Sequence, residues 1–413
     1  MNPPGLMGRL SPGFQREREE SMAQSGTSCL GVNDVAPLRS VSNENQLYGK
    51  WSARRLFGVL IILLPIFRPQ TSSPQETLSL KGPPSCSSCQ IVVERELSMG
   101  GVEGPGIGQF FHVARDSLGR FFVSNEDVPD EIGVYDSTGT YLQTLGRQGE
   151  GPGEWLLVRD ISAVGGFLIV SDLMNARETV LDLHLNVIRT APLVGDPLSL
   201  AFLSDSTKVA NILIYSPERV GYPLHTIDAG GRITASFGYG GGVFRRDSES
   251  TAWRRLSTSS DGTVWSGHAR QYVIEKWTIT GERIQTVERS VDWFPPFTGV
   301  DSWSPDVPPD PQMAGIWEDP DRHLWVVVYV PDPEWREAMS PAQGGGYISL
   351  ASDYLDMMVE VIDPGSGEVL VGHRFDLAGK LIGGGRMAAY REDEDGLPYL
   401  DVYKIRVDRG ERR

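Results

Sequence analysis

The sequence lacks most of the short motifs that identify an active site. Its 413 residues include only six histidines and three cysteines. The histidines form no H-E-x-x-H or other short metal-binding pair, and no G-x-S-x-G nucleophile motif occurs. A glycine-rich stretch, GRQGEGPGEW at residues 146–155, matches neither common phosphate-binding pattern, and its proline and glutamates do not suit an anion. Because these motifs are absent, the sequence points to no particular reaction and to no catalytic residue.

The chain is also short of basic residues. Its 38 Lys and Arg residues against 54 Asp and Glu residues give a formal net charge of −16. Nucleic-acid phosphates have to be neutralised by Lys and Arg, so this balance argues against nucleic acid as a partner. The hydrophobic content of 40% is sufficient for a large core. We also expect the protein to be a monomer.

No apolar run reaches the roughly 20 residues of a membrane-spanning helix. The run at residues 56–67 is preceded by Lys50, Arg54 and Arg55, which is typical of an export signal. Because no A-x-A-like cleavage site follows, residues 50–68 are either a signal peptide or an uncleaved anchor that holds the protein at a membrane through residues 56–67. A buried helix of the globular domain is the third interpretation. We expect an exported protein, located in the periplasm, the cell envelope or outside the cell.

Two segments flank this signal. Residues 1–49 are rich in Ser, Asn, Gln, Gly and Pro without apolar periodicity, which indicates disorder or an over-extended gene start. Residues 69–89 are predicted to be a linker that contains a C-x-x-C motif, Cys86 and Cys89. In an exported chain a local disulfide is the simplest interpretation, and a redox or metal role is the alternative.

Residues 90–413 contain a repeated pattern. Similar strand–turn–strand units occur at residues 134–146, 180–192, 226–238, 276–288 and 361–373, and Asp136, Asp182 and Asp228 are spaced 46 residues apart. A second hairpin precedes each unit, and six such turns can be found, from RDSLGR to REDEDG. Four-stranded sheets of this size bury both faces only when they stack radially. The sequence therefore predicts an all-β, six-bladed β-propeller of four-stranded antiparallel blades; a β-sandwich would not give this period.

The ends of the repeat region predict how the ring closes. The last repeat unit lacks an outer strand, because the sequence ends soon after DVYKIRVD. The segment IVVEREL near residue 90 is a predicted strand that belongs to no other blade. We expect residues 90–99 to form the outer strand of the last blade, beside residues 399–407.

SDLMNARETVLD (residues 171–182) is similar to the D-x-x-N-x-R-I-x-V-F-D run of NHL-type propellers. LGRQGEGPGEW resembles the blade connector of bacterial secreted six-bladed propellers of the NHL-repeat and TolB-like type, a group in which an early C-x-x-C and a D-x-x-G-R turn are also familiar. The resemblance implies a fold and export rather than a reaction. It makes residues 146–155 a connector between the first two blades, with Trp155 wedged between them.

Two long insertions, residues 289–312 and 331–356, are expected on the face where the connectors gather. They bring the aromatic residues Trp293, Phe294, Trp303, Trp335 and Tyr347. Such rings could stack on sugars or peptides, and the alternative is that they only pack the loops against the blades.

The innermost strands should line a central channel. Alignment of the turn glycines places His112, Asp160, Arg255 and Arg386 at matching positions of four blades. They could form an anion or polar-ligand site, or be ion-paired residues that contact only water.

Two functional hypotheses follow. The first is an exported binding or scaffolding module that takes a peptide, glycan or protein partner on its loop face, without a cofactor. The second is a metal-assisted hydrolase, lactonase or lyase with Ca²⁺ on the axis, for which Asn125, Glu126, Asp172 and Asn175 are candidates by residue type.

Overall fold

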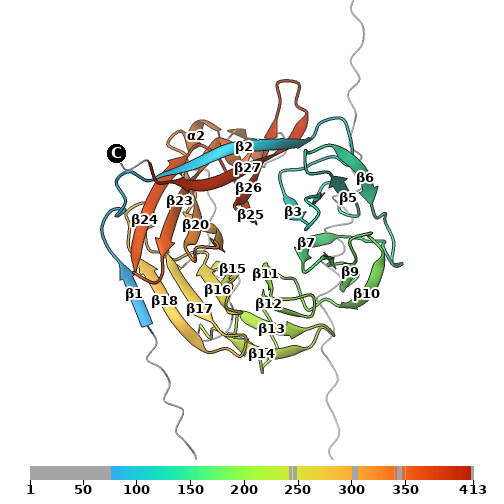
Figure 1. Cartoon of the computed structure of the whole chain (residues 1–413), viewed down its shortest axis with the longest axis horizontal. Coiled ribbons are helices and arrows are strands. Elements are labelled where there is room, and N and C mark those ends of the chain that lie inside the picture. The colour runs from blue at the N-terminus through green and yellow to red at the C-terminus, as the bar shows by residue number, and fades with distance from the viewer. Residues whose placement is uncertain are drawn as a thin grey trace, which may run out of the picture. The chain divides into compact units, whose positions relative to one another are not determined.

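The computed structural model describes residues 76–240, 244, 249–299, 306–338, 340–341, 347–348 and 350–410. Within them, six blades of four antiparallel strands stand in a ring around a central axis, and one blade carries a fifth, parallel strand at its outer edge (Figure 1). This confirms the predicted all-β, six-bladed propeller. The apolar run at residues 56–67 and Trp303 lie outside the described residues. No helix in the described part of the chain is long and apolar enough to cross a membrane.

In every blade the strands follow one another from the axis outward. Blade one has β3 (Phe111–Arg115), β4 (Phe121–Asn125), β5 (Ile132–Tyr135) and β6 (Tyr141–Leu145). Blade two has β7 (Val158–Val164), β8 (Phe167–Asp172), β9 (Arg177–Leu181) and β10 (Val187–Pro192). Blade three has β11 (Ser199–Phe202), β12 (Thr207–Asn211), β13 (Leu224–Asp228) and β14 (Ile233–Phe237).

Blade four has β15 (Arg254–Thr258), β16 (Val264–His268), β17 (Val273–Trp277) and β18 (Arg283–Arg289). Blade five has β19 (Gln312–Glu318), β20 (Leu324–Pro331), β23 (Leu355–Asp363) and β24 (Glu368–Phe375). Its insertion carries α2 (Trp335–Ala338), the short pair β21 (Ser340–Pro341) and β22 (Tyr347–Ile348), and α3 (Ala351–Tyr354). Blade six has β25 (Lys380–Gly383), β26 (Arg386–Glu392), β27 (Pro398–Asp408) and β2 (Gln90–Gly100). A 3₁₀ turn, η1 (Glu249–Ala252), precedes blade four.

The aspartates spaced 46 residues apart occupy the same turn in successive blades. Each stands at the end of the third strand or directly after it, and its carboxylate accepts backbone N–H bonds from the turn. Asp136 Oδ1, for example, accepts from the amides of Thr138 at 2.8 Å and Thr140 at 3.0 Å. The amides of the turn have no partner in the sheet, and the carboxylate accepts their hydrogen bonds instead. This explains why Asp recurs at this position of the turn.

Neighbouring blades pack face to face through apolar side chains. Trp155 is fully buried and belongs to one apolar cluster with Phe122 and Ile132 of blade one and with Ile161 and Leu168 of blade two. Trp155 therefore lies between the blades, as its place in the connector predicts. The connector at residues 146–155 turns the chain from β6 back to the axis.

Polar side chains at the end of the second strand of a blade hold the loops that enter the blades by hydrogen bonds. Asn125 ends β4 and donates to Gly106 O at 2.6 Å, and Asp172 ends β8 and accepts from the Leu157 amide at 3.1 Å. Asn211 ends β12 and accepts from the backbone of the connector into blade four. All three side chains are buried, so these bonds are shielded from water.

The N-terminal segment forms a belt over the outer edges of three blades. β1 (Glu76–Leu80) pairs in parallel with β18, the amides of Ser85 and Cys86 donate to carbonyl groups of β24, and β2 pairs antiparallel with β27 (Figure 1). The sequence predicts only a linker over residues 69–89, whereas the structure adds a strand there. Cys86 and Cys89 form a disulfide within the belt. The belt covers strand edges that would otherwise expose unpaired backbone groups.

Candidate functional site

The innermost strands of the six blades enclose a central channel of about 870 Å³. Its wall is built from β3, β7, β11, β15, β19 and β25. On the connector face, Glu126, Pro197 and residues 350–352 also line it. The last of these belong to the insertion of blade five, so this insertion reaches the channel mouth.

Three of the four predicted ring residues line this channel. His112, Asp160 and Arg255 stand near the start of β3, β7 and β15, close to the connector face. Arg386 does not belong to this ring. It lies on β26, the second strand of blade six, where its Nε atom is 2.6 Å from Glu96 Oε2 of β2.

The error has a specific source. The repeat pattern predicts that the REDEDG turn is the inner hairpin of blade six, but that turn joins β26 to β27. The inner hairpin instead turns at Gly383–Gly385 and joins β25 to β26. In blade six the position near the start of the innermost strand is occupied by Lys380, which begins β25 and lines the channel. The run GGG at residues 383–385 was the available indication of this turn.

Lys380 places a cation in the channel. Its Nζ atom donates to Phe111 O at 3.2 Å, and the side chain remains exposed to channel water. The blades surround the ammonium group on all sides, and this loss of solvation lowers its pKa; the carboxylate of Asp160 opposes the shift. No carboxylate of the described residues forms an ion pair with it.

Arg255 is a second cation without a counter-ion. Its Nε atom donates to Met313 O at 3.2 Å, and none of the described carboxylates lies within ion-pair distance of its guanidinium group. Loss of solvation lowers its pKa. Most other arginines in the described chain are paired with Asp or Glu, as the examples of Arg120, Arg289 and Arg374 show. The Arg255 guanidinium thus faces the channel without an ion-pair partner among the described residues.

His112 and Asp160 stand beside these cations. His112 Nδ1 lies 3.9 Å from Asp160 Oδ1, and it is buried without a hydrogen-bond partner. Loss of solvation, reinforced by Lys380 and Arg159, holds the pKa of His112 well below its usual value, so the imidazole is neutral at pH 7. Asp160 accepts a hydrogen bond from Ser162 Oγ at 2.9 Å. Loss of solvation raises the pKa of Asp160, and Lys380 acts in the opposite direction.

The channel is therefore more positive than the chain around it. Among the described residues, four cationic side chains line the channel, those of Arg115, Arg159, Arg255 and Lys380, against two carboxylates, those of Glu126 and Asp160. Arg159 is paired with Asp196, its Nε atom lying 2.7 Å from Asp196 Oδ1. In a protein with a formal net charge of −16, such a concentration of cations is unusual. The arrangement can attract and hold an anion.

The predicted aromatic residues lie mostly in packed surroundings. Phe294 is buried against Tyr272, and Trp293 is half-buried beside Phe294. Trp335 is buried in α2, with the Arg336 guanidinium 4.9 Å from its ring centre. Packing of the loops accounts for Phe294 and Trp335, whereas Trp293 keeps part of its ring exposed.

The remaining predicted residues are dispersed. Tyr347 lies on β22, within the insertion of blade five. Among the four residues named for an axial Ca²⁺, Asn125 and Asp172 bind connector backbone, and Asn175 donates to Gly149 O at 2.9 Å. Only Glu126 lines the channel. The structure does not bring these four side chains together on the axis.

Fold and site together define a six-bladed β-propeller with a cationic central channel. No protein-family model matches the chain, and no curated protein matches it. Among solved structures, a member of the DUF4221 family from Bacteroides vulgatus is similar, with a TM-score of 0.53 and 10% identity over 78% of this chain and 99% of that one.

Two further structures are similar at lower scores. An exported protein from Bacteroides fragilis has a TM-score of 0.49 and 11% identity over 79% of this chain and 99% of that one. A streptogramin B lyase has a TM-score of 0.40 and 10% identity over 77% of this chain and 98% of that one. At these identities the likeness shows the fold alone, and no activity follows from it.

Proposed function

We propose that this protein is an exported binding module that takes a carboxylate-bearing ligand into the central channel from the connector face. The observation that carries the proposal is the guanidinium group of Arg255, which faces the channel without a carboxylate partner among the described residues and stands in the same ring as Lys380.

The energetics favour an anionic ligand. A cation that is enclosed by the blades without a counter-ion is costly, and an incoming carboxylate relieves this cost at both Arg255 and Lys380. The orphaned Nδ1 atom of His112 offers a further polar contact to the same ligand. Asp160 would disfavour a second anionic group next to the first, which adds selectivity.

The dimensions suit a small molecule or the end of a chain. A volume of about 870 Å³ lies within the usual range for ligand pockets. Residues 350–352 lie at the channel mouth, so the insertion of blade five can contact the part of a ligand that extends out of the channel. An acidic peptide, an acidic glycan or an acidic segment of a partner protein shares the required chemistry.

Two observations support export. Lys50, Arg54 and Arg55 precede an apolar run, as in export signals. The disulfide between Cys86 and Cys89 is typical of an oxidising compartment.

Metal-assisted chemistry on the axis is less well supported. Only Glu126 and Asp160 supply carboxylates to the channel lining, and Arg159, Arg255 and Lys380 would repel a metal cation there. The lining thus favours an anion over a cation.

The test is calorimetric titration of the purified full chain with glucuronate oligomers and with acidic peptides. Arg255→Met and Lys380→Met should each weaken binding by about tenfold or more, since each removes a charged contact worth roughly 1.5–3 kcal/mol. Arg232→Met is the matched control, because Arg232 is an exposed arginine on a turn of blade three. Binding that is equal in all four proteins, or no binding of any anion by the wild type, would overturn the proposal.

A further inference from the structure

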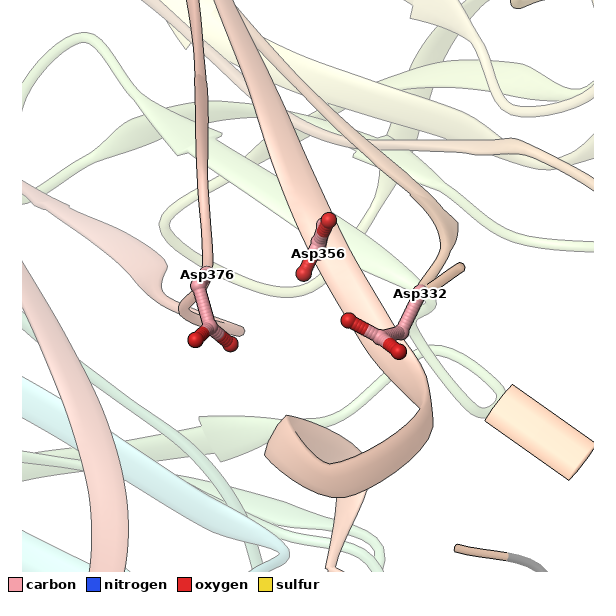
Figure 2. A group of neighbouring side chains, drawn as sticks. All are labelled: Asp332, Asp356 and Asp376. Carbon is pink, nitrogen blue, oxygen red and sulfur yellow. The ribbon is translucent and has the colours of Figure 1, made fainter. Parts of the chain in front are cut away.

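Three carboxylates converge at one end of blade five, away from the channel wall. Asp332 directly follows β20, Asp356 is the second residue of β23, and Asp376 directly follows β24. One oxygen atom from each lies within 4.8 Å of the others (Figure 2). Figure 2 shows the three side chains coming from three separate segments, with Asp356 between the other two.

The central carboxylate is incompletely satisfied. Asp356 is only 4% exposed, and its Oδ2 atom accepts from Arg374 Nε at 2.5 Å. Its Oδ1 atom is buried and has no hydrogen-bond partner. A buried carboxylate oxygen without a donor is costly, which indicates a partner that the protein chain itself does not supply.

The local charge balance identifies the kind of partner. Three carboxylates and one guanidinium, that of Arg374, leave two negative charges if all are ionised. Like charges at this separation are stable only when a cation or a shared proton joins them.

We propose that Asp332, Asp356 and Asp376 bind a divalent cation of the Ca²⁺ type. Ca²⁺ takes six to eight oxygen ligands at about 2.3–2.6 Å, so ligand oxygens on one ion lie up to roughly 5 Å apart. The spacing of the three carboxylates fits this range without rearrangement of the backbone. Mg²⁺ needs a tighter octahedron and fits less well.

This ion would have a structural consequence. Asp332 and Asp356 stand at the two ends of the blade-five insertion, and the Asp332 amide donates to Tyr354 O at 3.0 Å. A cation bound to both and to Asp376 joins the base of the insertion to the chain that leaves β24. It would therefore hold in place the insertion that contributes residues 350–352 to the channel mouth. Cation binding at these three aspartates does not depend on the ligand proposed for the channel.

The experiment uses the full chain, stripped with EDTA and titrated with CaCl₂ alone in a calorimeter, with thermal unfolding measured in parallel. We expect saturable binding and a higher melting temperature in Ca²⁺ than in EDTA. Asp376→Asn should weaken binding by about tenfold or more, because it removes one of few charged ligands. Asp376 is exposed, so this variant should fold normally.

The matched control is Asp310→Asn, the same change at an exposed aspartate that precedes β19. It should bind Ca²⁺ as the wild type does, whereas Asp356→Asn should not. Wild-type protein that shows neither heat nor a shift in melting temperature in millimolar Ca²⁺ would overturn the proposal and leave a shared proton as the explanation. Equal Ca²⁺ affinity in Asp376→Asn and the wild type would overturn it as well.

Discussion

A β-carbon on Gly146 would lie 2.1 Å from the indole ring of Trp155. Gly146 has a φ of 92°, a conformation that side chains disfavour, and the indole occupies the space that its missing side chain leaves. Trp155 is in turn buried between blades one and two. The connector therefore depends on these two residues together.

Gly146 and Trp155 can be tested by a double-mutant cycle. Trp155→Ala should lower the free energy of unfolding by about 3–5 kcal/mol through the cavity that it leaves. Gly146→Ala should also destabilise the fold, through the overlap with the indole and the strained φ. The double variant should lose less than the sum of the two, because the smaller residue at position 155 removes the overlap. Urea unfolding measures all four proteins, and strict additivity would mean that the two residues act separately.

The stability of the protein should depend on His225 in mildly acidic solution. This side chain is fully buried and lies within 2.9 Å of Ser236 Oγ, and loss of solvation lowers its pKa from 6.5 to about 4. A lowered folded-state pKa means that its contribution is complete above pH 6.5 and is lost as the pH falls toward 4.

Between pH 7.5 and 4.5, protonation of His225 in the unfolded state should cost about 2–3 kcal/mol of stability. His225→Gln lacks this proton equilibrium, so its stability should fall less over the same interval. Chemical denaturation at the two pH values gives the comparison. Parallel losses in both proteins would assign the acid sensitivity to other groups.

The disulfide should stabilise the fold modestly. Cys86 and Cys89 close a loop of only four residues, for which the chain-entropy model gives about 2 kcal/mol. The double variant Cys86→Ser/Cys89→Ser should show this loss in oxidising buffer, and reduction of the wild type should reproduce it. If the reduced wild type unfolds at the same denaturant concentration as the oxidised protein, the disulfide has no role in holding the belt.

Export can be tested with a reporter that is active only outside the cytoplasm, fused after residue 80. Residues 1–80 should direct it out of the cytoplasm. Ile61→Asp with Leu63→Asp should abolish the activity, because each charge costs about 2.5–3.5 kcal/mol in an apolar segment. A matched pair of changes at Ser72 and Ser73 to Asp, outside the apolar run, should leave it intact. Activity that survives the first pair would remove the export interpretation.

The sequence alone was sufficient for the number and kind of blades. Turn residues such as Asp136, Asp182 and Asp228 act locally, because each carboxylate bonds the backbone within four residues of itself. Their spacing therefore records the repeat directly, and the period leaves few architectures that bury both faces of each sheet. The position of Trp155 followed from the resemblance of residues 146–155 to a blade connector.

The channel and the carboxylate cluster were decided by tertiary structure. Whether Lys380 or Arg386 faces the axis depends on which of two turns in blade six is the inner one, and both turns contain glycine. The three carboxylates of blade five come from positions 332, 356 and 376, which no local pattern connects. They meet because strand pairing places the end of β20, the start of β23 and the end of β24 at one edge of the sheet. Local sequence specifies turns, whereas long-range register determines which side chains converge, since a shift of one residue reverses the face to which each side chain points.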